Sequence, residues 1–199
     1  MEKKYLKESM EGEKIILKRH EIRLAQKMFE YVCKDKERLS RFLPWPPHIK
    51  SVDDEIKFIE ESINAWDRYA GANYGIFRKT DKEYLGNVGA FNFDWDNESC
   101  EIGYWILGDY EGHGYMRDAV QALENELFLN GFNRIVIMCE KENQRSKLIP
   151  KSLGYTFEGR LRELKKAYDK YVTLESHSKL RRECKIEGLK LKGEKGLET

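Results

Sequence analysis

The sequence predicts an α/β protein with a mixed, mostly antiparallel central sheet flanked by helices. Three observations lead to this fold class. Helical and strand-like patterns alternate along most of the chain, three strand candidates follow one another between residues 73 and 107, and a glycine turn then opens an amphipathic helix. Strands joined by short turns form an antiparallel meander, and the later helices and strands make the complete sheet a mixed one.

The chain is expected to begin with a strand, a helix and a proline-rich loop. Residues 14–18 are largely apolar and predict the first strand, and residues 21–33 carry apolar side chains at helical spacing. Residues 41–48 contain three prolines within four positions, which would break any strand ladder. We therefore expect a loop there.

A second helix and the meander follow this loop. Ser51 and Asp54 form a capping pair at the start of a helix over about 52–69, where apolar residues recur at steps of three and four. Turn residues then separate the three strand candidates. These strands are expected at 73–78, 84–93 and 100–107.

The rest of the domain alternates between helices and strands. The glycine turn opens a helix that ends near Asn130 and Gly131, a normal C-terminal stop, and a shorter helix follows Asn143. The remaining strands are expected at 134–139, 155–159 and 168–178. We assign residues 1–181 to a single domain and residues 182–199 to a charged C-terminal extension, frayed or helical.

Composition restricts the functional class. The 199 residues carry a formal net charge of +1, whereas a nucleic-acid-binding protein usually has a strong basic excess. No apolar run approaches a membrane span, and the first residues lack the apolar core of a signal peptide. Four cysteines without a C-x-x-C pair argue against a zinc site, so we expect no metal and a cytoplasmic protein with reduced thiols.

The most informative segment lies between residues 101 and 119, where a strand runs through a glycine turn into a helix. Gly112 and Gly114 let the backbone approach a ligand closely, because they carry no side chain. The first N–H groups of the helix lack intrahelical partners and favour an anion such as phosphate. A G-x-G turn alone is weak evidence, and neither a P-loop nor a dinucleotide-binding pattern fits this segment.

Two motifs in this order resemble the GNAT acetyltransferase family. Residues 101–105 read Glu-Ile-Gly-Tyr-Trp and residues 112–116 read Gly-His-Gly-Tyr-Met, which is similar to the acetyl-CoA-binding pattern Q/R-x-x-G-x-G/A. Residues 143–146, Asn-Gln-Arg-Ser, resemble the N-x-x-S signature about thirty residues later. The similarity is strongest to the ribosomal-protein-serine acetyltransferase branch, including the Trp-Pro loop.

The resemblance implies a GNAT-type sheet and acetyl-CoA as cosubstrate. In the family, backbone amides of the glycine loop hold the pyrophosphate, and the strand before it pairs with the pantetheine arm. The residues that the resemblance assigns to the cosubstrate are Trp105, Ile106, Leu107, Glu111, Gly112, His113, Gly114, Tyr115, Met116, Asn143 and Ser146.

Three positions depart from the family pattern. Glu111 stands where relatives have Gln or Arg, so its carboxylate must turn away from the pyrophosphate. Ser152 stands where a lysine is common. Pro150 lies inside the predicted short helix, which it should kink or end early.

Three residues are catalytic candidates. The resemblance makes Ser146 the donor of a proton to the departing thiolate, and a helix-capping hydroxyl is the alternative reading. Glu101, on the strand that faces the cosubstrate, is a candidate base acting through water, although it and Cys100 face opposite sides and only one can line the cleft. Glu163, in a loop before the last strand, is a second candidate base, and Lys165 is an alternative occupant of that site.

Three functions remain open from the sequence. The first is acetyl transfer to a protein N-terminal α-amine, as in ribosomal-protein acetyltransferases, and the second is acetyl transfer to a small amine such as a polyamine, an amino acid or an antibiotic. The third is a CoA-binding interaction module without catalysis. The partners expected are acetyl-CoA and one of these acceptors, with a homodimer as a possibility from the family and no nucleic acid or membrane.

Overall fold

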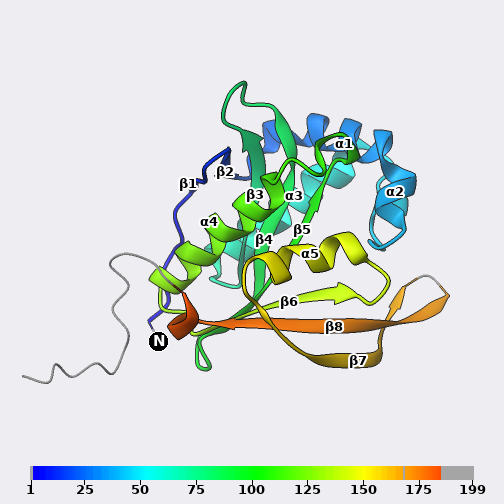
Figure 1. Cartoon of the computed structure of the whole chain (residues 1–199). Helices are drawn as coiled ribbons and strands as arrows, with labels where there is room; N and C mark the ends of the chain where they lie inside the picture. The colour runs from blue at the N-terminus through cyan, green and yellow to red at the C-terminus, as the bar shows by residue number, and fades with distance from the viewer. Residues whose placement is uncertain (1, 168, 185–199) are drawn as a thin grey trace, which may run out of the picture.

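The protein is described by a computed structural model that covers residues 2–167 and 169–184. Its strands form one eight-stranded sheet in the order β1-β2-β3-β4-β5-β6-β8-β7 (Figure 1). The strands are β1 (Ser9–Glu11), β2 (Ile15–Arg19), β3 (Gly71–Arg78), β4 (Tyr84–Asp94), β5 (Ser99–Ile106), β6 (Arg134–Glu140), β7 (Thr156–Ala167) and β8 (Lys170–Leu180). Every neighbouring pair is antiparallel except β5 and β6, which are parallel.

Helices cover both faces of the sheet. They are α1 (Ala25–Lys34), α2 (Lys36–Ser40), α3 (Val52–Asp67), α4 (Tyr115–Leu129) and α5 (Gln144–Ser152). Helix α4 lies across one face, and α3 lies across the opposite face beside α1 (Figure 1). The larger core joins the apolar side of α4 to the sheet, and a smaller core joins α1 and α3 to Tyr84 on β4.

The structure confirms the predicted fold class and the antiparallel meander of β3, β4 and β5. It adds two short elements that the sequence pattern did not predict, the strand β1 and the helix α2. Most of the predicted extension, residues 185–199, lies outside the described residues, so the domain boundary stays a prediction. No helix in the described ranges is long and apolar enough to cross a membrane.

Local sequence signals explain where the helices begin. Asp54 Oδ2 accepts a hydrogen bond from the backbone N–H of Ser51 at 3.0 Å, so the predicted capping box opens α3. In α4, the carboxylate of Asp118 accepts hydrogen bonds from the backbone N–H groups of Glu13 and Lys14 at 2.9 and 2.7 Å. The start of α4 is thereby joined to the β1–β2 turn.

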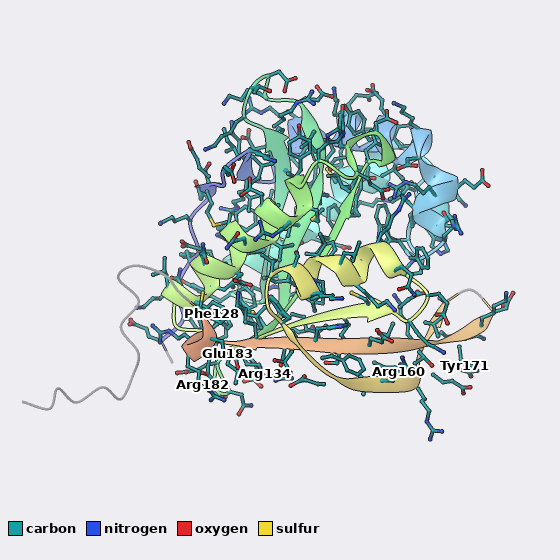
Figure 2. The ribbon with its side chains drawn as sticks, in the orientation of Figure 1. Phe128, Arg134, Arg160, Tyr171, Arg182 and Glu183 are labelled. Carbon is teal, nitrogen blue, oxygen red and sulfur yellow. The ribbon has the colours of Figure 1, made fainter. Side chains whose placement is uncertain are left out.

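The hairpin of β7 and β8 forms the far edge of the sheet. Tyr171 of this hairpin is exposed, whereas Arg160 pairs with Glu175 of β8 at 3.0 Å (Figure 2). The register between the strands shifts twice along the hairpin, and Glu163 in the second shift has a left-handed backbone with φ of 53°. This long hairpin therefore presents an irregular, solvent-facing edge.

Candidate functional site

The site begins where β5 and β6 separate. The two strands pair at only three positions, from Ser99 opposite Arg134 to Glu101 opposite Val136. Beyond Glu101, β5 continues to pair with β4 on its other side as far as Ile106. The two strands therefore enclose a wedge that opens toward the end of β5.

The wedge exposes backbone hydrogen-bonding groups of β5. The N–H of Leu107 donates to the carbonyl of Leu85 at 2.9 Å, which fixes the alternation along the strand. The odd-numbered residues face β4, so Tyr104 and Ile106 direct their N–H and C=O groups toward the wedge. Consistent with this, the carbonyl of Ile106 accepts a hydrogen bond from Arg38 at 2.6 Å. Such an edge can pair with an extended ligand that contains amide groups.

The glycine loop closes the wide end of the wedge. Gly112 and Gly114 have φ values of 81° and 80°, a left-handed conformation that glycine adopts at little cost. Gly114 is the N-cap of α4, and a Cβ atom at Gly112 would meet nothing within 4 Å. The free N–H groups of the first turn of α4 therefore face an open space suited to an anion.

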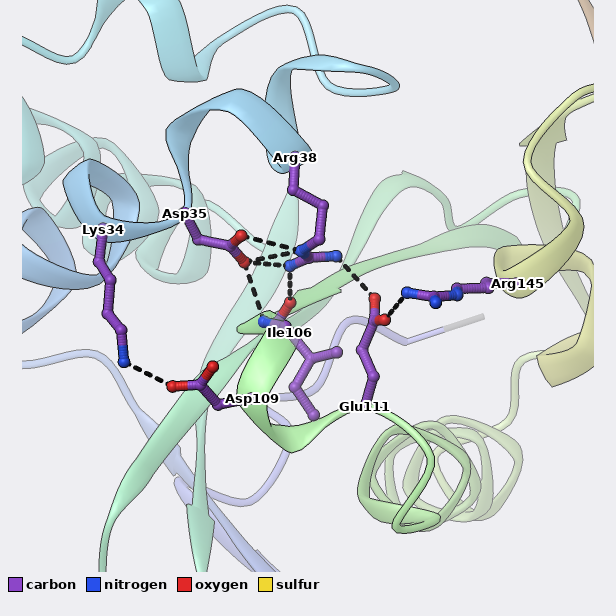
Figure 3. A network of polar contacts seen from close by, with 8 residues as sticks. Lys34, Asp35, Arg38, Ile106, Asp109, Glu111 and Arg145 are labelled. Atoms are coloured by element: carbon purple, nitrogen blue, oxygen red, sulfur yellow. Dashed lines mark hydrogen bonds and ion pairs between the residues drawn. The ribbon is translucent and has the colours of Figure 1, made fainter.

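Glu111, at the start of this loop, is held between two arginines (Figure 3). Its Oε1 lies 2.6 Å from Arg38 of α2, and its Oε2 contacts Arg145 of α5. Arg38 is itself bound through Nε to Asp35 at 2.9 Å, and Asp35 also accepts from the N–H of Gly108 at 2.9 Å. The negative charge of Glu111 is thus neutralised by side chains from two other segments.

The other predicted loop residues take different positions. His113 is exposed, and its carbonyl lies 3.4 Å from the ammonium of Lys14. Tyr115 is half-buried, with its ring centroid 5.7 Å from that of His113. The side chains of Met116 and Leu107 are buried, so only their backbone groups can serve a ligand.

Ser146 lies at the opposite wall of the wedge, in the first turn of α5. The helix cap is Asn143, whose Oδ1 accepts from the N–H of Ser146 at 3.1 Å, so the hydroxyl of Ser146 is not the capping group. That hydroxyl lies 3.3 Å from the hydroxyl of Tyr104 and 3.2 Å from the sulfur of Cys139. The hydroxyl of Ser146 is thereby placed between β5 and β6.

Tyr104 also explains how α5 tolerates Pro150. The helix continues past Pro150 to Ser152, so the expected early end does not occur. A proline has no N–H, and the carbonyl that would normally receive one belongs to Ser146, four residues earlier. The hydroxyl of Tyr104 donates to this carbonyl at 3.0 Å and takes the place of the missing N–H. Burial raises the pKa of Tyr104 well above its usual value, which keeps it a donor.

The two candidate bases lie in different surroundings. Glu101 is half-buried and accepts from Asn92 at 3.0 Å, while its neighbour Cys100 is buried in the larger core. Glu101 therefore faces the side of the sheet on which Trp105 lies. Glu163 is exposed and belongs to strand β7, so its predicted position in a loop is wrong. Neither carboxylate contacts Ser146 in the described structure.

A buried polar cluster, made of His20, Glu55, Tyr84 and Asn87, lies on the same side of the sheet as Trp105. Asn87 Oδ1 lies 3.0 Å from His20 Nε2 and accepts from the Tyr84 hydroxyl at 2.9 Å. Burial lowers the pKa of His20 to about 4 and raises the pKa of Glu55 to about 7. Asn87 is opposite Trp105 in the β4–β5 pairing, so the cluster adjoins the strand that lines the wedge.

The sequence assigned no role to three of these groups. Arg38 lies outside the quoted motifs, whereas Tyr104 and Arg145 lie within them. All three acquire their roles only when separate segments meet at the wedge. Within residues 2–167 and 169–184, no group of three or more His, Cys, Asp or Glu side chains is arranged to hold a metal ion.

Known proteins share both the sequence pattern and the fold. Residues 14–156 match the family model described as an acetyltransferase (GNAT) domain. The ribosomal-protein-serine acetyltransferase of Escherichia coli (strain K12) is 29% identical over 146 residues, which are 71% of this chain and 80% of that protein.

Two solved structures have the same fold. RimL, a ribosomal α-N-protein acetyltransferase joined to coenzyme A by a disulfide, has a TM-score of 0.80 at 24% identity, covering 84% of this chain and 94% of that chain. The microcin self-immunity acetyltransferase MccE, in complex with acetyl-CoA and AMP, has a TM-score of 0.81 at 24% identity, covering 84% and 93%.

Proposed function

The chain belongs to the GNAT acetyltransferase family and is an N-acetyltransferase that uses acetyl-CoA, and on this premise we propose that its acceptor is the α-amino group at the N-terminus of a protein. The similarity to the E. coli ribosomal-protein-serine acetyltransferase supports this acceptor class. A ribosomal protein is therefore the first acceptor to test.

The chemistry of the acceptor also supports an α-amine. The pKa of an α-amino group is about 7.7–8.0, against about 10.4 for the lysine side chain. Near pH 7, roughly a tenth of the α-amino groups are therefore neutral, whereas less than about a thousandth of the lysine side chains are neutral. Only the neutral amine has the lone pair that attacks the thioester. A site with a weak base is therefore better suited to an α-amine.

We assign the wedge to acetyl-CoA. The backbone N–H and C=O of Tyr104 and the N–H of Ile106 suit the amide-containing pantetheine arm, and the loop of Gly112 and Gly114 suits the pyrophosphate. The cosubstrate supplies the acetyl thioester. The observation that carries the proposal is that this edge, this loop and the hydroxyl of Ser146 surround one wedge.

We propose that Ser146 protonates the leaving group. The amine forms a bond to the carbonyl carbon, the carbon–sulfur bond breaks, and the thiolate takes the hydroxyl proton of Ser146. Ser146 regains a proton from water, and the proton that the amine releases to the solvent balances it. The Tyr104 hydroxyl donates its proton to the Ser146 carbonyl and accepts a hydrogen bond from Ser146 Oγ. The Ser146 hydroxyl must therefore rotate away from Tyr104 before it can donate its proton to the thiolate. Cys139 lies 3.2 Å from Ser146 Oγ, so in this scheme its thiol would also neighbour the departing sulfur.

We favour Glu101 over Glu163 as the base. Glu101 is half-buried on the strand that lines the wedge, whereas Glu163 is exposed in the β7–β8 hairpin. The acceptor amine loses its proton to Glu101 through a water molecule in this scheme. Glu163 then belongs to the surface that receives the acceptor.

The charge of the β7–β8 hairpin favours an acidic acceptor. Between residues 160 and 170, five cationic side chains stand against two acidic ones, Glu163 and Asp169. The cationic residues are Arg160, Arg162, Lys165, Lys166 and Lys170, and all are exposed. Arg160 pairs with Glu175 of β8 at 3.0 Å, so the other four cations carry the excess charge. Acidic residues that follow the acceptor's N-terminus would be attracted to this hairpin.

A small amine is the second candidate acceptor, because the fold by itself does not select an acceptor: the microcin self-immunity acetyltransferase MccE shares it to the same extent as RimL. The two candidate acceptors predict different acetylated products. Incubation with acetyl-CoA and three acceptors separates them: a peptide with a free N-terminus and internal lysine, the same peptide with a blocked N-terminus, and spermidine. We expect mass spectrometry to find one acetyl group on the free peptide alone. Acetylation of spermidine alone would contradict the proposal.

The cosubstrate site is tested separately by calorimetric titration with acetyl-CoA. We expect saturable binding by the wild type and none by Gly114→Trp, whose side chain would fill the loop. Far-UV circular dichroism checks that the variant is folded. Equal binding by a folded variant would remove the glycine loop from the site.

A further inference from the structure

The glycine loop begins with a residue of the wrong charge for its ligand. Glu111 stands immediately before Gly112, and only 22% of its side chain is exposed. A carboxylate beside a pyrophosphate repels it, and the repulsion is strong where solvent screens poorly. Cations from elsewhere in the chain must therefore offset both charges when the cosubstrate binds.

The two arginines that contact Glu111 are held very differently (Figure 3). Arg38 is 31% exposed and also binds Asp35 and the carbonyl of Ile106, so it is fixed in place. The side chain of Arg145 is 75% exposed, and Glu111 is the acidic group that it contacts. Arg38 is thus a structural part of the network, while Arg145 can leave it.

The contact between Glu111 and Arg145 crosses the mouth of the wedge. Glu111 lies on the loop that leads from β5 to α4, and Arg145 lies on the first turn of α5, beside Ser146. The cosubstrate, placed in the wedge by the proposed function, has to pass this contact. Its phosphates would then lie on the side of the glycine loop where Glu111 holds Arg145.

We propose that Arg145 is a phosphate-binding residue for acetyl-CoA and that Glu111 holds its guanidinium at the loop until the cosubstrate arrives. On binding, Arg145 exchanges the carboxylate for a phosphate, to which its planar fork can donate two hydrogen bonds. Glu111 keeps Arg38 as its partner, so no carboxylate is left uncompensated. The inference rests on the proposed placement of acetyl-CoA in the wedge.

The test compares binding of CoA with binding of pantetheine, which lacks the phosphates, by calorimetric titration. We expect Arg145→Ala to weaken CoA binding about tenfold, as for one charge-assisted hydrogen bond partly screened by solvent, and to leave pantetheine binding unchanged. Glu111→Gln should strengthen CoA binding about threefold by releasing Arg145. This gain should be clearly smaller when Glu111→Gln is added to Arg145→Ala, because only the loss of repulsion between Glu111 and the phosphates then remains.

Lys151→Ala is the matched control, because Lys151 is an exposed cation on the same helix. CoA binding at wild-type strength by Arg145→Ala would overturn the inference. An equal gain for CoA and pantetheine in Glu111→Gln would also overturn it, since the ion pair would then be a steric gate. Failure of the wild type to bind CoA would instead remove the proposed site itself, so the two failures are distinguishable.

Discussion

The hydrogen bond from Tyr104 to α5 offers a quantitative test of how the site is built. The Tyr104 hydroxyl donates to the Ser146 carbonyl at 3.0 Å, where Pro150 provides no N–H. Tyr104→Phe removes this donor and leaves a part-buried carbonyl without its partner. An unmade hydrogen bond of this kind costs about 1–2 kcal/mol, so we expect the free energy of unfolding to fall by that amount.

Pro150→Ala should remove most of this cost. The alanine restores a backbone N–H four residues after Ser146, and that N–H can form the ordinary helical bond to the same carbonyl. In this background we expect Tyr104→Phe to cost only about 0.5 kcal/mol, which leaves a coupling energy of about 1 kcal/mol between the two sites. The stability of Pro150→Ala itself combines a better helix with a more flexible unfolded chain, so the coupling is the informative quantity.

The assay is urea unfolding of the four proteins in the cycle, followed by far-UV circular dichroism. A loss of 1 kcal/mol corresponds to about 2–4 °C in Tm for a chain of this length. Tyr74→Phe is the control, because the Tyr74 hydroxyl donates to the carbonyl of Lys7 at 2.9 Å, far from α5. The reasoning is refuted if Tyr104→Phe costs the same with and without Pro150, or if Tyr74→Phe couples to Pro150 equally.

Three further predictions concern buried charges and close packing. Burial raises the pKa of Glu55 from 4.5 to about 7, so its protonated form stabilises the fold at low pH and that stability is lost as pH rises through 7. The free energy of unfolding of Glu55→Gln, measured with urea, should therefore rise relative to that of the wild type by up to about 3 kcal/mol between pH 5 and pH 8. A difference between the two proteins that does not change with pH would contradict this. Lys179→Met should cost about 3 kcal/mol in thermal unfolding because it leaves the buried carboxylate of Glu124 unpaired, and adding Glu124→Gln should recover most of it. Gly12→Ala places a Cβ atom 2.4 Å from Asp118 Oδ1, so it should displace that carboxylate and lower stability by about 1–3 kcal/mol, with faster amide exchange in the β1–β2 turn as the decisive readout.

The sequence predicted the regular elements that are long enough to show a period. The helix α3 and the strands of the meander have several apolar positions each, so their patterns are clear. Strand β1 has three residues and α2 has five, which is too short for a period to emerge. Their existence depends on pairing with β2 and on contacts made after the chain has folded.

The candidate site was predictable only where one segment carries it. Gly112, Gly114 and Ser146 belong to local motifs, so their positions could be expected from the sequence. Arg145 reaches Glu111 across 34 positions and Tyr104 reaches Ser146 across 42, so both contacts depend on tertiary structure. The roles of these residues in the wedge become visible only in three dimensions.

The short parallel pairing of β5 and β6 also makes the interior of the sheet mechanically weak along one line. Only three residue pairs join the meander to the group formed by β6, β8 and β7, whereas β3 and β4 share seven. A force that draws the two outer edges of the sheet apart would be carried at this line by few hydrogen bonds and by the side chains of α4. Among the strands from β2 to β8, the sheet is expected to tear there first, leaving two smaller sheets whose own strands remain paired.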